Sequence, residues 1–151
     1  MPRKKIKRKV FLDTNVILCY LSGDPRCERL FEKSALRDYQ YVVNPIVVQE
    51  LFHAIEFSRA RGKMKRRDLN KLLSRLEVTE LGGEKEISDF AEFSKSRNFI
   101  VHANDLLNIN TALRECDFFV TLDVKLLNLD RVGRTKFLSP SKFLSSELRE
   151  K

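Results

Sequence analysis

Short apolar runs alternate with amphipathic stretches along this chain, and the alternation predicts most of its secondary structure. Five runs have the composition of buried strands, at residues 9–12, 41–44, 78–81, 117–123 and 135–140. Helical periodicity lies between and after them, at residues 16–23, 25–36, 45–59, 68–76, 84–96, 103–115, 125–129 and 141–148. We expect Asn44 to cap the helix that starts at Pro45, because this pair stands in the order that helix starts prefer.

The predicted strands are continuously apolar instead of alternating, which indicates burial on both faces. Strands that alternate with helices in this way favour a parallel sheet between two layers of helices. The length of 151 residues suits one domain, and the chain shows no repeat or linker. We therefore expect a single α/β domain over residues 1–151, a three-layer α/β/α fold in which residues 1–8 form a basic tail.

The strong positive charge of the chain favours negatively charged partners. The formal net charge is +8 and the isoelectric point is near 9.6, so the surface field should attract polyanions such as nucleic acid. Two short runs hold twelve of the 29 basic residues: Arg3, Lys4, Lys5, Lys7, Arg8 and Lys9 in the first, and Arg59, Arg61, Lys63, Lys65, Arg66 and Arg67 in the second. A solvated tail and a solvated loop explain either run alone equally well.

The cysteines and the N-terminal residues indicate the cellular compartment in which we expect the protein. Cys19, Cys27 and Cys116 are odd in number and widely spaced, which favours reduced thiols in a cytoplasmic protein over disulfides or a zinc site. The basic start followed by apolar residues superficially resembles a secretory signal. Residues 13–15, Asp-Thr-Asn, interrupt the apolar stretch, so we expect neither a signal peptide nor a membrane span.

Four carboxylates stand where an α/β sheet usually binds ligands or where burial is expected. Asp13 and Asp123 each end a predicted strand, and ligands bind outside the carboxyl ends of parallel strands. Glu50 shares a helix face with Ile46, Val47 and Ala54, so we expect that face to be buried. Asp105 shares a face with Asn108, Ile109 and Ala112. Turn, cap and helix-dipole roles remain the alternative for the aspartates.

Grouped carboxylates repel one another, and a hard divalent cation with oxygen ligands, Mg²⁺ or Mn²⁺, relieves the repulsion. Zinc is disfavoured, since the only imidazoles are His53 and His102, at unrelated positions. Metal held by carboxylates beside a basic surface suits phosphodiester cleavage. The five glycines form no phosphate-binding fingerprint, which argues against a dinucleotide or nucleoside-triphosphate enzyme.

The motifs FLDTNVIL at 11–18, VVQEL at 47–51, NDLLNINTAL at 104–113 and FVTLDVKLL at 119–127 resemble, in order and spacing, the acidic motifs of PIN domains. The resemblance spans roughly residues 9–138. It implies a sheet of about five parallel strands, metal-dependent cleavage of RNA, and often a toxin paired with an antitoxin protein. It also implies homodimers.

Carried over by position, the resemblance gives the metal-binding and catalytic roles to Asp13, Glu50, Asp105 and Asp123. Asn15 and Thr121 match the polar residues that orient those acids. The N-terminal basic tail is longer than a minimal toxin needs, and it fits an RNA- or ribosome-processing nuclease equally well.

Three other functions compete with a nuclease. A haloacid dehalogenase phosphatase needs a second Asp two residues after the first, where this chain has Asn15. A phosphoacceptor receiver domain needs adjacent acids near the N-terminus. A non-catalytic RNA-binding or protein-interaction module on the same fold would have no need for carboxylates on apolar helix faces.

Overall fold

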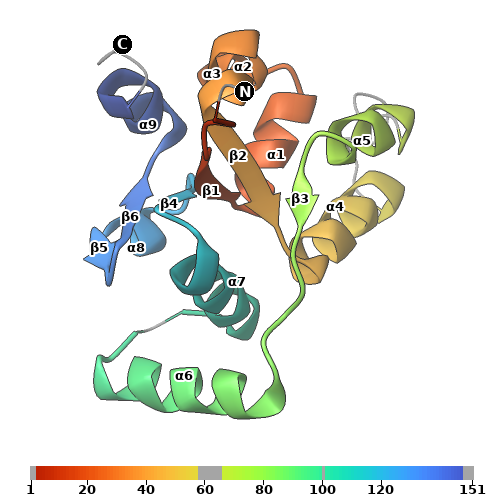
Figure 1. Cartoon of the computed structure of the whole chain (residues 1–151). Helices are drawn as coiled ribbons and strands as arrows, with labels where there is room; N and C mark the ends of the chain where they lie inside the picture. The colour runs from red at the N-terminus through yellow and green to blue at the C-terminus, as the bar shows by residue number, and fades with distance from the viewer. Residues whose placement is uncertain (1–2, 58–65, 100, 148–151) are drawn as a thin grey trace.

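A single six-stranded sheet organises the molecule (Figure 1). The computed structural model describes residues 3–57, 66–99 and 101–147. The strand order is β3-β2-β1-β4-β6-β5, and all neighbours are parallel except β5 and β6. The bounds are β1 Arg8–Leu12, β2 Tyr39–Val43, β3 Glu77–Val78, β4 Phe118–Val120, β5 Arg131–Val132 and β6 Thr135–Leu138.

Helices pack on both sides of this sheet, which confirms the predicted α/β/α class. Their bounds are α1 Thr14–Leu21, α2 Pro25–Glu28, α3 Lys33–Asp38, α4 Pro45–Phe57, α5 Arg66–Leu73, α6 Glu84–Ser96, α7 Ala103–Glu115, α8 Val124–Leu127 and α9 Pro140–Glu147, with a 3₁₀ turn η1 at Arg29–Phe31. Among the described residues, no helix combines the length and apolar character needed to cross a membrane.

Two predicted elements differ from the structure. The single helix expected at residues 25–36 is divided into α2, η1 and α3. The break before α3 lies at Glu32, which is extended, with φ −68° and ψ 154°. The predicted sheet lacked β5, which pairs antiparallel with β6 through only Arg131 and Val132. Gly133 turns the chain between them at φ +58°, a conformation that glycine adopts without strain.

A row of stacked phenylalanines fixes the register of the central strands. Phe11 of β1 is paired with Phe119 of β4, which is paired with Phe137 of β6. The ring centroids are 5.0 Å apart in both steps. Because these aromatic contacts hold the strands in one register, β1 and β4 end level with each other, at Leu12 and Val120.

The strand order reverses between β1 and β4. The connection from β1 leads to β2 on one side, whereas β4 lies on the other side of β1. Such a reversal opens a crevice at the carboxyl ends of the two strands. The residues after Leu12 and Val120 therefore lie at this crevice.

Buried hydrogen bonds of Asn44 join the two helices that flank the crevice. Its Oδ1 accepts from the Val47 amide at 3.0 Å, which confirms the predicted helix cap. Its Nδ2 donates to Asn108 Oδ1 and to Thr111 Oγ1, both at 3.0 Å. Asn44 thus connects the start of α4 to the middle of α7.

We expect Asn44→Ala to lower the free energy of unfolding by about 3 kcal/mol, because the variant loses a helix cap and leaves buried polar groups of α7 without partners. Urea denaturation checks this value. Gln49→Ala, at an exposed position of α4, is the control and should change stability by less than about 0.5 kcal/mol. Equal effects of the two substitutions would contradict the role given to Asn44.

Candidate functional site

Asp13 is a buried carboxylate at the crevice between β1 and β4. Its amide donates to the Val120 carbonyl at 3.1 Å, which extends the strand pairing by one residue. Its Oδ1 accepts from the Thr14 amide at 2.8 Å, and its Oδ2 accepts from Thr121 Oγ1 at 2.8 Å. Only 6% of the residue is exposed. The two strand ends therefore hold this carboxylate in one orientation.

Asn15 makes a second connection across the crevice. Its Nδ2 lies 3.4 Å from Asp13 Oδ2 and 3.3 Å from Thr121 Oγ1, while its Oδ1 accepts from the Leu122 amide at 3.1 Å. Thr121 Oγ1 also accepts from the Asp123 amide at 3.0 Å. The structure thus places the predicted helper residues Asn15 and Thr121 in contact with Asp13.

Burial raises the pKa of Asp13 to about 6, because desolvation disfavours its charged form. The hydrogen bond from Thr121 opposes the rise, and the negative charges of Asp105 and Glu50 add to it. Burial also raises the pKa of Glu50, with a further contribution from Asp105. The three carboxylates therefore share one electrostatic environment, although Asp13 precedes α1 while Glu50 and Asp105 lie on α4 and α7.

Glu50 differs from its prediction in one respect. The buried side of α4 consists of Val47, Leu51 and Ile55, whereas Glu50 is only partly buried. It lines a cavity of about 460 Å³ together with Thr14 and Asn104. The expectation of a buried face for Glu50 was wrong, because helical spacing located the apolar stripe one position away from its true centre.

Asp105 and Asp123 line a neighbouring cavity of about 230 Å³ with His102 and Lys125. Burial raises the pKa of Asp105, the charge of Asp123 raises it further, and His102 opposes the rise. Asp123 Oδ1 accepts from the Lys125 amide at 2.9 Å, so Asp123 also caps α8. A cap role and a ligand role are compatible, since only one of the two carboxylate oxygens accepts a hydrogen bond from the start of α8.

These residues have the chemistry of a Mg²⁺ or Mn²⁺ site, although no three His, Cys, Asp or Glu side chains of the described residues lie close enough to hold an ion together. Carboxylate oxygens are the ligands that both ions prefer. The buried Thr14 Oγ1 has no hydrogen-bond partner, although it lies near enough to Glu50 to oppose the rise of that pKa. An unpartnered buried hydroxyl beside repelling carboxylates fits a hydrated cation.

The basic runs lie apart from these acids or outside the described residues. Lys5 Nζ lies 3.3 Å from Asp38 Oδ1, and Lys7 Nζ donates to the Leu36 carbonyl at 2.6 Å. Both contacts are with α3, near the start of β1, whereas Asp13 follows its end. In the second run, Arg59, Arg61, Lys63 and Lys65 lie outside the described residues, as do the side chains of Arg66 and Arg67.

Sequence reasoning missed His102, Lys125 and Thr14 as members of the site. Each stands within three residues of a predicted acid in the chain. That proximity was the available signal. It was weak, because a residue before a helix and a lysine in a first turn are ordinary surface features.

Comparisons with known proteins bear on the family and the fold of the chain. A sequence model described as "PIN domain" matches residues 10–132. Among solved structures, VapBC2 from Rickettsia felis, bound to a DNA fragment from its promoter, has a TM-score of 0.66 at 19% identity over 85% of this chain and 98% of that chain. No curated protein matches the chain in sequence.

Two further structures have the same fold. VapBC from Salmonella typhimurium, bound to DNA, has a TM-score of 0.66 at 20% identity, covering 88% of this chain and 98% of that one. PAE2754 from Pyrobaculum aerophilum has a TM-score of 0.61 at 15% identity, covering 95% and 91%. These similarities extend across nearly the whole domain.

The raised pKa of Asp13 predicts a pH dependence of stability. Its pKa rises from 3.8 to about 6 on folding, so the native state binds the proton more tightly than the unfolded chain. This carboxylate therefore lowers stability progressively as pH increases from about 4 to about 6, by about 3 kcal/mol in total. The shifts of Glu50 and Asp105 have the same sign.

Asp13→Asn should remove that contribution in chelator-treated protein. Relative to wild type, the variant should gain up to about 3 kcal/mol between about pH 4 and pH 7, less any loss from altered hydrogen bonds. Denaturant titrations at both pH values give the difference. Asp89→Asn, at an exposed position of α6, should follow wild type. Parallel pH profiles for Asp13→Asn and wild type would contradict the assigned burial cost.

Proposed function

The chain belongs to the PIN domain family, a family of nucleases, and we propose that it is a divalent-metal-dependent endoribonuclease. The observation that carries the proposal is the buried carboxylate of Asp13, whose pKa is raised by burial and by two acids from other helices. In this protein of net charge +8, Asp13 follows the end of β1 and interacts electrostatically with Glu50 and Asp105. That arrangement supports cation-assisted cleavage of a polyanion.

Asp13, Glu50, Asp105 and Asp123 would hold the ion, Mg²⁺ or Mn²⁺. Because no three of these side chains lie close enough together in the described structure, they would have to move toward one another around the ion. When bound, such an ion lowers the pKa of an attacking water and neutralises charge that develops on the phosphate. Thr121 and Asn15 keep the Asp13 carboxylate directed into the crevice through the hydrogen bonds described above. The side chain of Lys125 lines the cavity of Asp105 and Asp123 and would provide a positive charge for a substrate phosphate.

The basic runs at residues 3–9 and 59–67 are proposed to bind RNA outside the crevice. Because Lys5 and Lys7 lie near the opposite end of β1 from Asp13, the first run would contact a distant part of a long RNA. We propose a cytoplasmic location, which the three buried free cysteines support.

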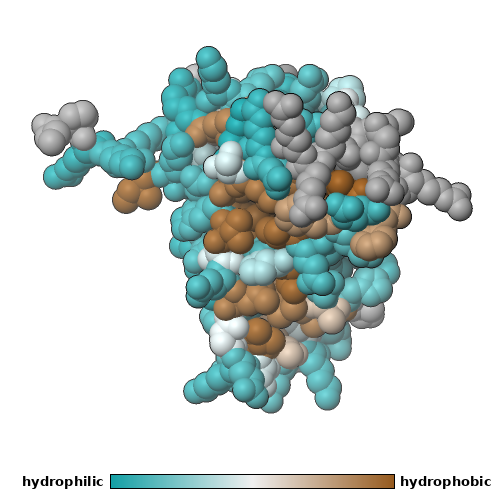
Figure 2. All heavy atoms as spheres, turned by 90° about the vertical axis from the view of Figure 1, so that its right-hand side faces the viewer, coloured by the Kyte–Doolittle hydropathy of each residue, from teal (hydrophilic) through white to brown (hydrophobic). Residues whose placement is uncertain are grey.

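We further propose that the protein is the toxin of a toxin-antitoxin pair. Its support is the fold similarity to the VapBC structures. Apolar surface suitable for a protein partner is present: Figure 2 shows two hydrophobic areas on the side of the molecule that faces right in Figure 1. An apolar cavity of about 230 Å³ also lies between α6 and α7, beside Phe90 and Leu106. Homodimer formation stays a prediction.

A cleavage assay with labelled RNA tests the nuclease directly. The wild-type protein should cleave the RNA when Mn²⁺ or Mg²⁺ is present, and cleavage should stop when a chelator removes the ion. Asp105→Asn should lower the rate at least about 100-fold while the protein stays folded, because the ion contributes several kcal/mol to transition-state stabilisation. Asp89→Asn is the control and should cleave at the wild-type rate.

RNA binding by the wild type without any divalent-dependent cleavage would instead favour a non-catalytic module on the PIN fold. Unchanged cleavage by Asp105→Asn would show that the active acids lie elsewhere.

A further inference from the structure

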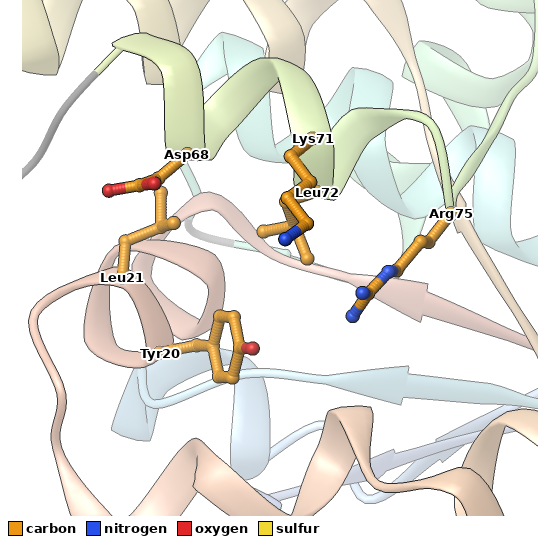
Figure 3. Close-up of a pocket in the computed structure, with 6 residues that line it drawn as sticks. All are labelled: Tyr20, Leu21, Asp68, Lys71, Leu72 and Arg75. Carbon is orange, nitrogen blue, oxygen red and sulfur yellow. The ribbon is translucent and has the colours of Figure 1, made fainter.

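A second polar cavity lies between the end of α1 and α5, away from the carboxylates (Figure 3). Its volume is about 300 Å³, and its lining residues are Tyr20, Leu21, Asp68, Lys71, Leu72 and Arg75. Neither the metal site nor the assignment of the basic runs involves these residues.

Two cations without partners face this cavity. Lys71 and Arg75 are exposed, and their side chains form no ion pair or hydrogen bond within the described part of the chain. By contrast, Arg26 is hydrogen-bonded to Asp24 at 2.8 Å, and Arg114 lies 3.5 Å from Glu86. Within the described residues, these two cations therefore have no direct ionic partner, although the Asp68 carboxylate lines the same cavity.

The side chains are arranged around a common space. Figure 3 shows the Lys71 amine and the Arg75 guanidinium directed from α5 and its end toward Tyr20, whereas the Asp68 carboxylate points away from them. The Tyr20 ring packs on Phe31 with centroids 4.3 Å apart, which fixes its position. A guanidinium, an ammonium group and a phenol hydroxyl around one space form a set of donors suited to phosphate.

The cavity stands within reach of the carboxylate crevice. Helix α1 starts at Thr14, beside Asp13, and ends at Leu21, which lines the cavity. Seven helical residues rise about 10 Å, a distance that a short stretch of single-stranded RNA can span. Leu18 lies between them on α1 and lines the cavity of Glu50. Two separate cavities therefore lie along α1, one beside Glu50 and one beside Lys71 and Arg75.

We propose that this cavity binds a backbone phosphate of the RNA substrate, a few nucleotides away from the bond that is cut. The inference rests on the proposed nuclease function, since it names a subsite for the same substrate. RNA is favoured over an acidic peptide because the basic run at residues 59–67 leads directly into α5 in the sequence, and a high local density of cations suits a phosphate backbone.

Salt titrations of RNA binding test the subsite in the Asp105→Asn background, where cleavage should not interfere. For a single-stranded RNA of about 12 nucleotides, each phosphate contact contributes about 0.7 to the log-log slope of affinity against salt. Lys71→Ala combined with Arg75→Ala should make the slope shallower by about 0.7, because the variant loses one phosphate contact. Lys71→Met combined with Arg75→Met keeps the aliphatic stems and should give the same change.

The matched control combines Lys85→Ala with Lys95→Ala, two exposed lysines of α6, and alters the net charge by the same amount. It should leave the slope close to that of the parent. A dinucleotide probe, too short to reach from the acids to the cavity, should bind all variants equally. Equal slopes for the α5 and α6 variants would overturn the proposal. Weaker binding of polyglutamate, with RNA binding unchanged, would overturn it in favour of an acidic protein partner.

The cleavage assay tests the proposed nuclease activity separately from the proposed phosphate site. Suppose that the wild-type protein does not cleave RNA with Mn²⁺, while the α5 variants still show a shallower dependence of RNA affinity on salt. The cavity then binds RNA, and the proposed chemistry is wrong. If cleavage occurs and the α5 variants bind and cleave as the α6 control does, the subsite is wrong and the nuclease stands.

Discussion

The buried carboxylate of Asp13 is the constraint on which the site depends. Desolvating a charged group is unfavourable, and here the acids Glu50 and Asp105 add to the cost. The protein offsets part of it with donors from Thr14 and Thr121, which fix the carboxylate in place. The fold loses stability by keeping this group at the end of its central strand, and in the proposed function a divalent cation offsets that loss.

The rest of the fold holds the elements around that group in position. The stacked rings of Phe11, Phe119 and Phe137 align the strand ends, so that Thr121 lies across from Asp13. Asn44 joins α4 to α7, the helices that bear Glu50 and Asp105. The acids are far apart in sequence, and these few packed contacts determine how near they come.

The sequence predicted best those elements in which the periodic spacing of apolar residues continues over many positions. The helices at 84–96 and 103–115 have the predicted bounds, since propensity and apolar spacing agree there. The break at Glu32 and the short strand β5 could not be predicted, because single backbone angles and two-residue pairings leave no periodic signal. Spacing also could not show that Glu50 faces a cavity, or that Lys71 and Arg75 meet Tyr20, since those relations are set by packing between distant segments.

Diffraction from crystals soaked in Mn²⁺ tests the central claim most directly, because the anomalous signal locates the ion without reference to activity. The proposed metal site predicts a peak within about 2.0–2.6 Å of Asp13 or its neighbouring acids, Glu50, Asp105 and Asp123, in the crevice between β1 and β4. It also predicts that Asp13→Asn weakens or removes that peak. Full occupancy of Mn²⁺ elsewhere, with the crevice empty in the same crystal, would contradict the account.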